Sequence, residues 1–207
     1  MTKFGVFLLL VTTISVSAVY FECEYDYFRL GNIIGSQYSC HGMPRGGMDD
    51  PVVRGITGLH HTGRTNADVI GFYMYHDKRM TFIPRGLTPF FTNMRALALL
   101  NCSLTNLGSD DMVGYHSLQA LSLRENYIER IEPGFYQHVP NLLETNMFQN
   151  RLREVGHNIL APLVLLTGAN FVDNYCINMS ASDSNTLLAL QNALNANCSM
   201  VQESDQN

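Results

Sequence analysis

The sequence is poor in charged residues, and basic residues are the scarcer kind. Charged side chains make up 15% of the 207 residues and hydrophobic ones 46%, a composition that argues against a disordered chain. There are 13 basic and 18 acidic residues, and the formal net charge is −5. This balance excludes a strongly basic surface, so it speaks against nucleic acid or an anionic membrane as a partner.

Long apolar runs are also lacking, apart from one near the N-terminus. That run, from Phe4 to Ile14, follows Lys3 and leads into small residues that end at Ala18. A basic residue, a short apolar segment and small residues mark a secretory signal peptide, which we expect at residues 1–18. No later stretch predicts a membrane span, and no hydrophobic tail predicts a lipid anchor. We therefore expect a secreted, extracellular protein.

Residue patterns for catalysis are absent as well. No nucleophile–base pair, phosphate-binding loop or set of residues at metal-ligand spacing occurs. A metal site at His60 and His61 is a minor alternative, because adjacent residues of a strand point to opposite faces. The paired acids Asp110 and Asp111 are most simply a solvated turn. We expect no enzyme activity, no cofactor and no metal site.

What the sequence does contain is a repeat. The stretch from Leu118 to Ile131 reads L-x-x-L-x-L-x-x-N-x-I-x-x-I, which is the leucine-rich-repeat pattern. Leu121 and Leu123 alternate, so they face one side of a short strand. Asn126 follows where the chain turns, and its amide can serve backbone groups that the turn buries. Such a unit cannot bury its apolar face alone, so copies should stack on both sides of it.

Copies recur on both sides at a spacing of 24 residues. The positions aligned with Asn126, here called the ladder, are Lys78, Cys102, Asn126, Asn150 and Asn174. A second column of large residues holds Met112, Tyr136 and Leu160. In the first copy, which fits the pattern least well, the aligned residues are Ile70, Tyr73, Tyr75, Lys78, Met80 and Ile83. The repeats predict an α/β fold, a leucine-rich-repeat solenoid with a parallel concave sheet, over residues 59–174.

Five cysteines in an oxidising compartment leave one without a partner. Cys102 occupies the ladder, where a small and weakly polar side chain is tolerated inside the protein. The other four form one pair before the repeats, Cys23 and Cys40, and one pair after them, Cys176 and Cys198. We expect a disulfide within each pair and a buried free thiol at Cys102.

Each end of the array is expected to carry a cap, because terminal repeats leave an open core. Residues 19–58 are the expected N-terminal cap, a hairpin or loop closed by its disulfide. Residues 175–199 are the expected C-terminal cap helix, and residues 200–207 are a polar tail. Asp183 or Ser184 can cap that helix, whose inward face would hold Leu187, Leu190 and Leu194. Three N-x-S/T sequons permit N-glycosylation, at Asn101, Asn178 and Asn197.

The arrangement resembles the secreted leucine-rich-repeat proteins of flies and mosquitoes. These have a signal peptide, a two-cysteine N-terminal segment, 24-residue repeats and an NxCI-type end, here Asn174-Tyr175-Cys176-Ile177. Within that set the chain is similar to the short, coil-less members of the mosquito leucine-rich immune protein family. The resemblance implies secretion, ligand binding and a role in innate immunity. The coiled coil and extra cysteines of longer members do not follow these repeats, so we expect no covalent dimer.

We expect an extracellular protein-binding module, with a structural or matrix-associated extracellular protein as the alternative. Strand positions between the inward leucines would face the concave side and contact the protein ligand. The residues expected to do so are His76, Leu100, Arg124, Glu144, Asn146, Phe148 and Val172. Leu100, Arg124 and Phe148 share one column, and aromatic and arginine side chains dominate interface hot spots. These three residues are therefore the expected anchors.

Overall fold

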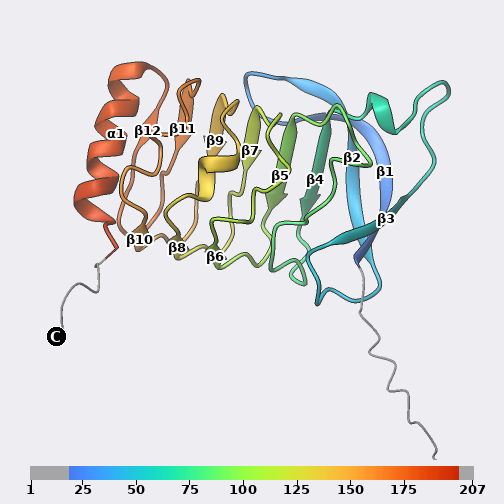
Figure 1. Ribbon diagram of the computed structural model, residues 1–207, viewed down its shortest axis with the longest axis horizontal. Helices are drawn as coiled ribbons and strands as arrows, with labels where there is room; N and C mark the ends of the chain where they lie inside the picture. The colour runs from blue at the N-terminus through green and yellow to red at the C-terminus, as the bar shows by residue number, and fades with distance from the viewer. Residues whose placement is uncertain (1–18, 201–207) are drawn as a thin grey trace, which may run out of the picture.

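The computed structural model describes residues 19–200, which form a parallel-sheet β-solenoid of about four turns (Figure 1). The expected signal peptide at residues 1–18 lies outside the described residues, as does the tail from residue 201 onward. The strands that pair in parallel along the solenoid are β4 (Gly71–Tyr75), β5 (Ala96–Leu100), β7 (Ala120–Ser122), β9 (Glu144–Asn146) and β11 (Gly168–Asn170). A second, smaller parallel sheet contains β6 (Asn106–Leu107), β8 (Arg130–Ile131) and β10 (Glu154–Val155).

The interior of each turn holds the residues that the repeat pattern predicts. Leu97, Leu99, Leu121 and Leu123 are buried in one continuous core with the large-residue column Met112, Tyr136 and Leu160. Thr145 stands where the pattern has leucine and is also buried, but its hydroxyl lies 2.9 Å from the Tyr136 hydroxyl. This hydrogen bond satisfies both hydroxyls, so the core accepts a polar residue at that position. The short 3₁₀ helix η2 (Phe135–His138) supplies Tyr136.

The ladder asparagines join each turn to the one before it. The amide nitrogen of Asn126 donates to the carbonyl oxygens of Leu99 (2.8 Å) and Leu123 (2.9 Å), and its oxygen accepts from the N–H of Leu104 at 3.3 Å. Asn150 makes the same three bonds one turn later, and Asn174 makes them again. Each amide therefore satisfies backbone groups from two turns, which the buried bend would otherwise leave unpaired.

The register of the first copy is wrong by one residue in the sequence-based alignment. In the structure β4 pairs with β5 so that Phe72 lies beside Leu97 and Met74 beside Leu99, a spacing of 25 residues. Phe72 and Met74 therefore point into the core, whereas Tyr73 and Tyr75 lie on the outer, concave side. The Phe72 ring fits because Gly42 has no Cβ, and a Cβ there would lie 2.3 Å from the ring.

The same one-residue shift changes which residue holds the ladder position of the first turn and which residue follows the end of its strand. His76 and Asn101 both have left-handed backbone angles, with φ of 61° and 50°, and the equivalent residues of later turns do too. His76 is thus equivalent to Asn101, and Asp77, not Lys78, holds the ladder position of the first turn. Lys78 instead extends its ammonium group to the backbone carbonyl of Cys102 at 3.0 Å. The extra residue is absorbed before Met80, because Met80 and Ile83 are buried as expected.

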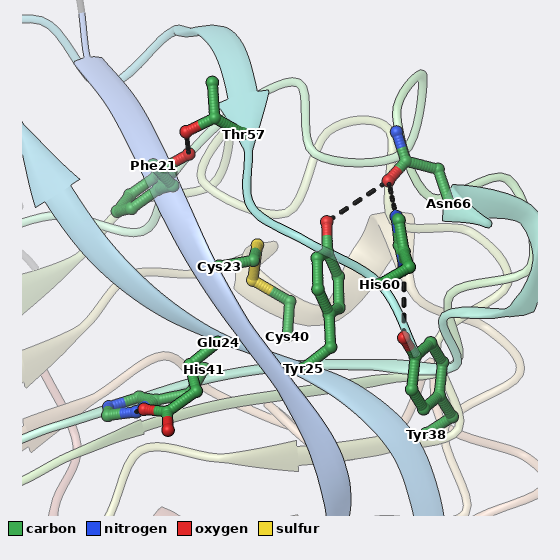
Figure 2. Close-up of a disulfide and its surroundings, with 10 residues drawn as sticks. All are labelled: Phe21, Cys23, Glu24, Tyr25, Tyr38, Cys40, His41, Thr57, His60 and Asn66. Atoms are coloured by element: carbon green, nitrogen blue, oxygen red, sulfur yellow. Dashed lines mark hydrogen bonds and ion pairs between the residues drawn. A yellow bond between two sulfur atoms is a disulfide. The ribbon is translucent and has the colours of Figure 1, made fainter. Parts of the chain in front are cut away.

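An N-terminal unit of three strands extends the main sheet at one end. Strand β1 (Val19–Arg29) pairs antiparallel with β2 (Ser36–Arg45) and parallel with β3 (Val53–Thr57), and β2 pairs in parallel with β4. The expected disulfide Cys23–Cys40 joins β1 to β2. Figure 2 shows this bond beside the rings of Tyr25 and His60. The N-terminal segment is therefore continuous with the solenoid sheet.

The other end of the sheet is closed by a short strand and a helix. Strand β12 (Ser180–Ala181), which the sequence did not predict, pairs antiparallel with β11. Helix α1 (Ser184–Asn197) follows, and the Asp183 carboxylate accepts the N–H groups of Asn185 and Thr186 as its N-cap. Leu190 and Leu194 are buried, Leu187 packs beside them, and the expected disulfide Cys176–Cys198 ties the helix end to the last turn. Among residues 19–200 no helix has the length and apolar character needed to cross a membrane.

Replacement of a ladder asparagine is predicted to destabilise the fold far more than replacement of an exposed one. Asn126→Leu removes the partners of three backbone groups, and each buried group left unsatisfied costs roughly 1–3 kcal/mol. Asn106→Leu is the matched control, since that side chain is exposed on β6. Urea denaturation of both variants checks this, and equal midpoints would contradict the ladder.

Cys102 is predicted to be unreactive in the folded protein. The thiol is free and buried, and burial raises its pKa to about 11, so it stays protonated at pH 8. We expect no reaction with N-ethylmaleimide under native conditions and one modified cysteine after denaturation without reductant. Peptide mapping without reduction should then recover Cys23–Cys40 and Cys176–Cys198. A bridge to Cys102, or rapid native labelling, would show that the assignment is wrong.

Candidate functional site beneath and beside the N-terminal hairpin

The loop between β1 and β2 crosses the outer side of the main sheet. Figure 1 shows this loop, residues 30–35, arching from the N-terminal unit over the middle strands. The N–H of Leu30 donates to the carbonyl oxygen of Gly35 at 3.2 Å and closes the loop at its base. The hairpin formed by β1, this loop and β2 therefore covers part of the concave face that the repeats create.

The tip of the hairpin binds to one carboxylate of the solenoid. The N–H groups of Asn32 and Ile33 donate to the two Glu144 oxygens, at 3.1 and 3.3 Å. Gly31 has φ of 106°, and a Cβ there would lie 1.6 Å from a Glu144 oxygen, so only glycine permits this approach. We expected Glu144 to contact a protein ligand, but its carboxylate instead binds residues of the same chain more than 100 positions earlier.

The residues in and next to the loop between β1 and β2 pack on the concave side of β4, β5 and β7. Leu30, with Phe28 and Ile34, covers a separate apolar cluster that includes Ala98 and Leu100. Leu100 is only 8% exposed as a result. The expectation that Leu100 anchors a protein ligand is therefore corrected, because the hairpin already occupies the space in front of it.

A cavity of about 590 Å³ lies between the hairpin and the sheet. Its roof is the hairpin from Phe28 to Ile33, and its floor is formed by the outward residues of the middle strands. Its far end reaches the β12 region at residues 180–182. A volume of this size lies within the usual range for small-molecule sites, roughly 300–1,000 Å³.

A row of outward side chains lies at the carboxyl ends of the strands, and the hairpin covers Leu100 within it. It consists of Tyr75, Leu100, Arg124, Phe148 and Val172. The carbonyl oxygens of the last four each accept an N–H from the preceding turn, at 2.8–3.1 Å, and these bonds keep the row in register. Arg124, Phe148 and Val172 are half-buried, and Tyr75 is 46% exposed. His76, expected in this row, lies at the strand end, and Tyr75 takes its place.

Aromatic rings continue the row toward the N-terminal unit. His41 stacks between Tyr73 and Tyr75, at centroid distances of 4.8 and 4.7 Å, and Phe28 stacks on Tyr73 at 3.9 Å. Burial raises the pKa of Tyr73 to about 12 and lowers the pKa of His41, although the nearby Glu24 carboxylate opposes the second shift. The stacked Tyr73 and His41 rings are therefore uncharged near neutral pH.

The histidine pair serves the N-terminal unit. His60 Nε2 lies 2.9 Å from the Asn66 Oδ1, so Nε2 carries the proton and Nδ1 accepts from the Tyr38 hydroxyl at 3.1 Å (Figure 2). Both ring nitrogens of His60 are occupied, and His61 is exposed. Among residues 19–200 no group of three metal-ligating side chains comes together. Asp111 accepts the Gly108 N–H and pairs with Arg85, as a turn residue does.

The three sequons differ in the state of their amide groups. The Asn101 amide nitrogen lies 2.8 Å from His76 Nδ1, and Lys78 donates to its oxygen, so both ends of this side chain are engaged. Asn178 is exposed, and only its oxygen accepts a hydrogen bond, from Asp173. Asn197 is exposed next to the disulfide-bonded Cys198. Among the described residues, the amide nitrogens of Asn178 and Asn197 therefore have no hydrogen-bond partner, whereas that of Asn101 has one.

The sequence predicted a hairpin or loop at the N-terminal cap, but not that it crosses the concave face, and not the polar floor of the cavity. The residues concerned are Phe28, Leu30, Gly31, Asn32, Ile33, Ser122 and Asn170. One signal was present: Ile33 and Ile34 lie between Gly31 and Gly35, and two isoleucines in a loop call for an apolar surface to cover. Ser122 and Asn170 were visible as neighbours of Asn146 in the repeat columns, but the cavity above them depends on the hairpin.

Comparison with known proteins gives no relative from which a function could be transferred. No protein-family model matches the chain, and no curated protein matches it significantly.

Proposed function

We propose that the chain is a leucine-rich-repeat solenoid that acts outside the cell as a protein-binding module. The observation that carries the proposal is the uncovered row Arg124, Phe148 and Val172. These side chains are half-buried on the sheet, and Phe148 and Val172 lie outside the cavity beneath the hairpin, which Arg124 also lines. Arginine and aromatic side chains with restricted freedom are the residues that most often dominate protein interfaces.

The hairpin completes a surface that the sheet alone cannot provide. Five strands about 4.8 Å apart span about 20 Å, so the whole concave face of the sheet offers at most a few hundred Å². A standard interface takes about 800 Å² from each partner. The outer side of the hairpin, where Ile33 is 46% exposed, offers the additional contact. The proposed interface therefore consists of the row and the outer side of the hairpin.

Extracellular location is supported by two kinds of observation. Two disulfides stabilise the ends of the array, and such bonds persist in oxidising compartments. The N-terminal pattern of a signal peptide agrees with them. The proposed role in innate immunity rests on the sequence resemblance alone.

A photo-crosslinking amino acid at position 148 tests where a partner binds. The protein with p-benzoylphenylalanine in place of Phe148 is incubated with extracellular fluid from the expressing tissue and irradiated. We expect a discrete crosslinked protein, which mass spectrometry identifies. The matched control carries the same group at Val164, which is 82% exposed in a loop away from the row, and should give no such product.

The identified partner is then measured against variants of the row. Arg124→Ala and Phe148→Ala are each expected to raise the Kd at least tenfold, about 1.4 kcal/mol, as truncation of an anchor does. Val164→Ala should leave the Kd unchanged. Crosslinks at position 164 only, or unchanged affinity in both row variants with the fold intact, would contradict the proposed interface.

A further inference from the structure

The cavity beneath the hairpin has an apolar half with a floor of small side chains. Strand pairing places Ala98 and Ala120 among the outward residues of β5 and β7, and neither fills the space above it. Leu30 and Leu100 form the walls of this half. An apolar body can therefore lie between the hairpin and the alanines, removed from water on both sides.

The other half of the cavity presents hydrogen-bond donors. Strand pairing aligns Ser122, Asn146 and Asn170 side by side on neighbouring strands, about 4.8 Å apart. The oxygen of Asn146 accepts the Phe148 N–H at 2.9 Å, and the oxygen of Asn170 accepts the Val172 N–H at 3.0 Å. These bonds orient both amides. Their NH₂ groups have no hydrogen-bond partner among the described residues, and both side chains line the cavity.

The donor row favours a ligand group that brings acceptor oxygens. Arg124 lines the cavity next to this row, and its guanidinium pairs with the Glu125 carboxylate. Glu144 is the acidic side chain of the lining, and both of its oxygens already accept hydrogen bonds from the hairpin tip. The two amide NH₂ groups match the two acceptor oxygens of a carboxylate.

We propose that this cavity binds a small amphipathic carboxylic acid. The apolar body lies between Leu30 and the alanine floor, and the carboxylate accepts from the amide groups of Asn146 and Asn170. The site lies under the hairpin, and Arg124 is the residue of the proposed interface row that also lines it. It does not depend on a protein partner, so either proposal can fail without the other.

Isothermal titration of the full chain with decanoate tests the proposal. We expect saturable 1:1 binding, and at least tenfold weaker binding of decan-1-ol, which has the same apolar body without the carboxylate. The variant with Asn146→Asp and Asn170→Asp keeps the oxygens that accept the backbone N–H groups and replaces both donors with negative charge. It should weaken decanoate binding at least tenfold. Asn106→Asp, the same change on the exposed side of β6, should have no effect.

A second measurement on the unmodified protein guards against variants that fail to fold. In ¹H–¹⁵N spectra, decanoate should shift the side-chain amide signals of Asn146 and Asn170 and leave that of Asn106 unchanged. No saturable binding up to millimolar decanoate, equal affinity for the alcohol, or shifts confined to other parts of the molecule would overturn the proposal.

Discussion

Hydrogen bonds from buried asparagine amides to the backbone of adjacent turns are the constraint on which the rest of the structure depends. Each ladder amide of Asn126, Asn150 and Asn174 contacts two turns, so it sets both the bend of its own turn and the position of the preceding one. The parallel strands of successive turns therefore pair in register. Equivalent residues of successive turns lie in straight rows on the concave side, and these rows form both the cavity floor and the exposed surface.

The second determinant is the contact between the hairpin tip and Glu144. The N–H groups of Asn32 and Ile33 donate to the Glu144 carboxylate on β9, and Gly31 leaves room for that carboxylate. This contact fixes how far the hairpin reaches across the sheet. The concave face is thereby divided. One part becomes a partly open cavity with an apolar and a donor-rich half, which Arg124 also lines, and the surface at Phe148 and Val172 remains uncovered. One surface can thus offer two kinds of binding site.

The sequence was sufficient for whatever depends on spacing along the chain. The repeat period, the ladder from Cys102 onward, the pairing of four cysteines and the capped helix all follow from local patterns that the structure reproduces. The register of the first turn could not be predicted in this way. Residues Phe72 to Tyr75 read FYMY and are apolar or aromatic at every position, so alternation cannot distinguish the inward from the outward side chains. The path of the hairpin across the concave face could not be predicted either, because its contact with Glu144 joins distant segments through backbone N–H groups, which every residue except proline carries.

Amide hydrogen exchange at Asn32 and Ile33 tests the central claim, that the hairpin is bound across the concave face through Glu144, most directly. The account predicts slow exchange of both amides in the native protein and exchange near the unfolded rate in Glu144→Ala. The amide of Ile128, which donates to the Asn150 side chain, should stay protected in both proteins. Unprotected Asn32 and Ile33 amides in the native protein, with Ile128 protected, would show that the hairpin does not close over the sheet.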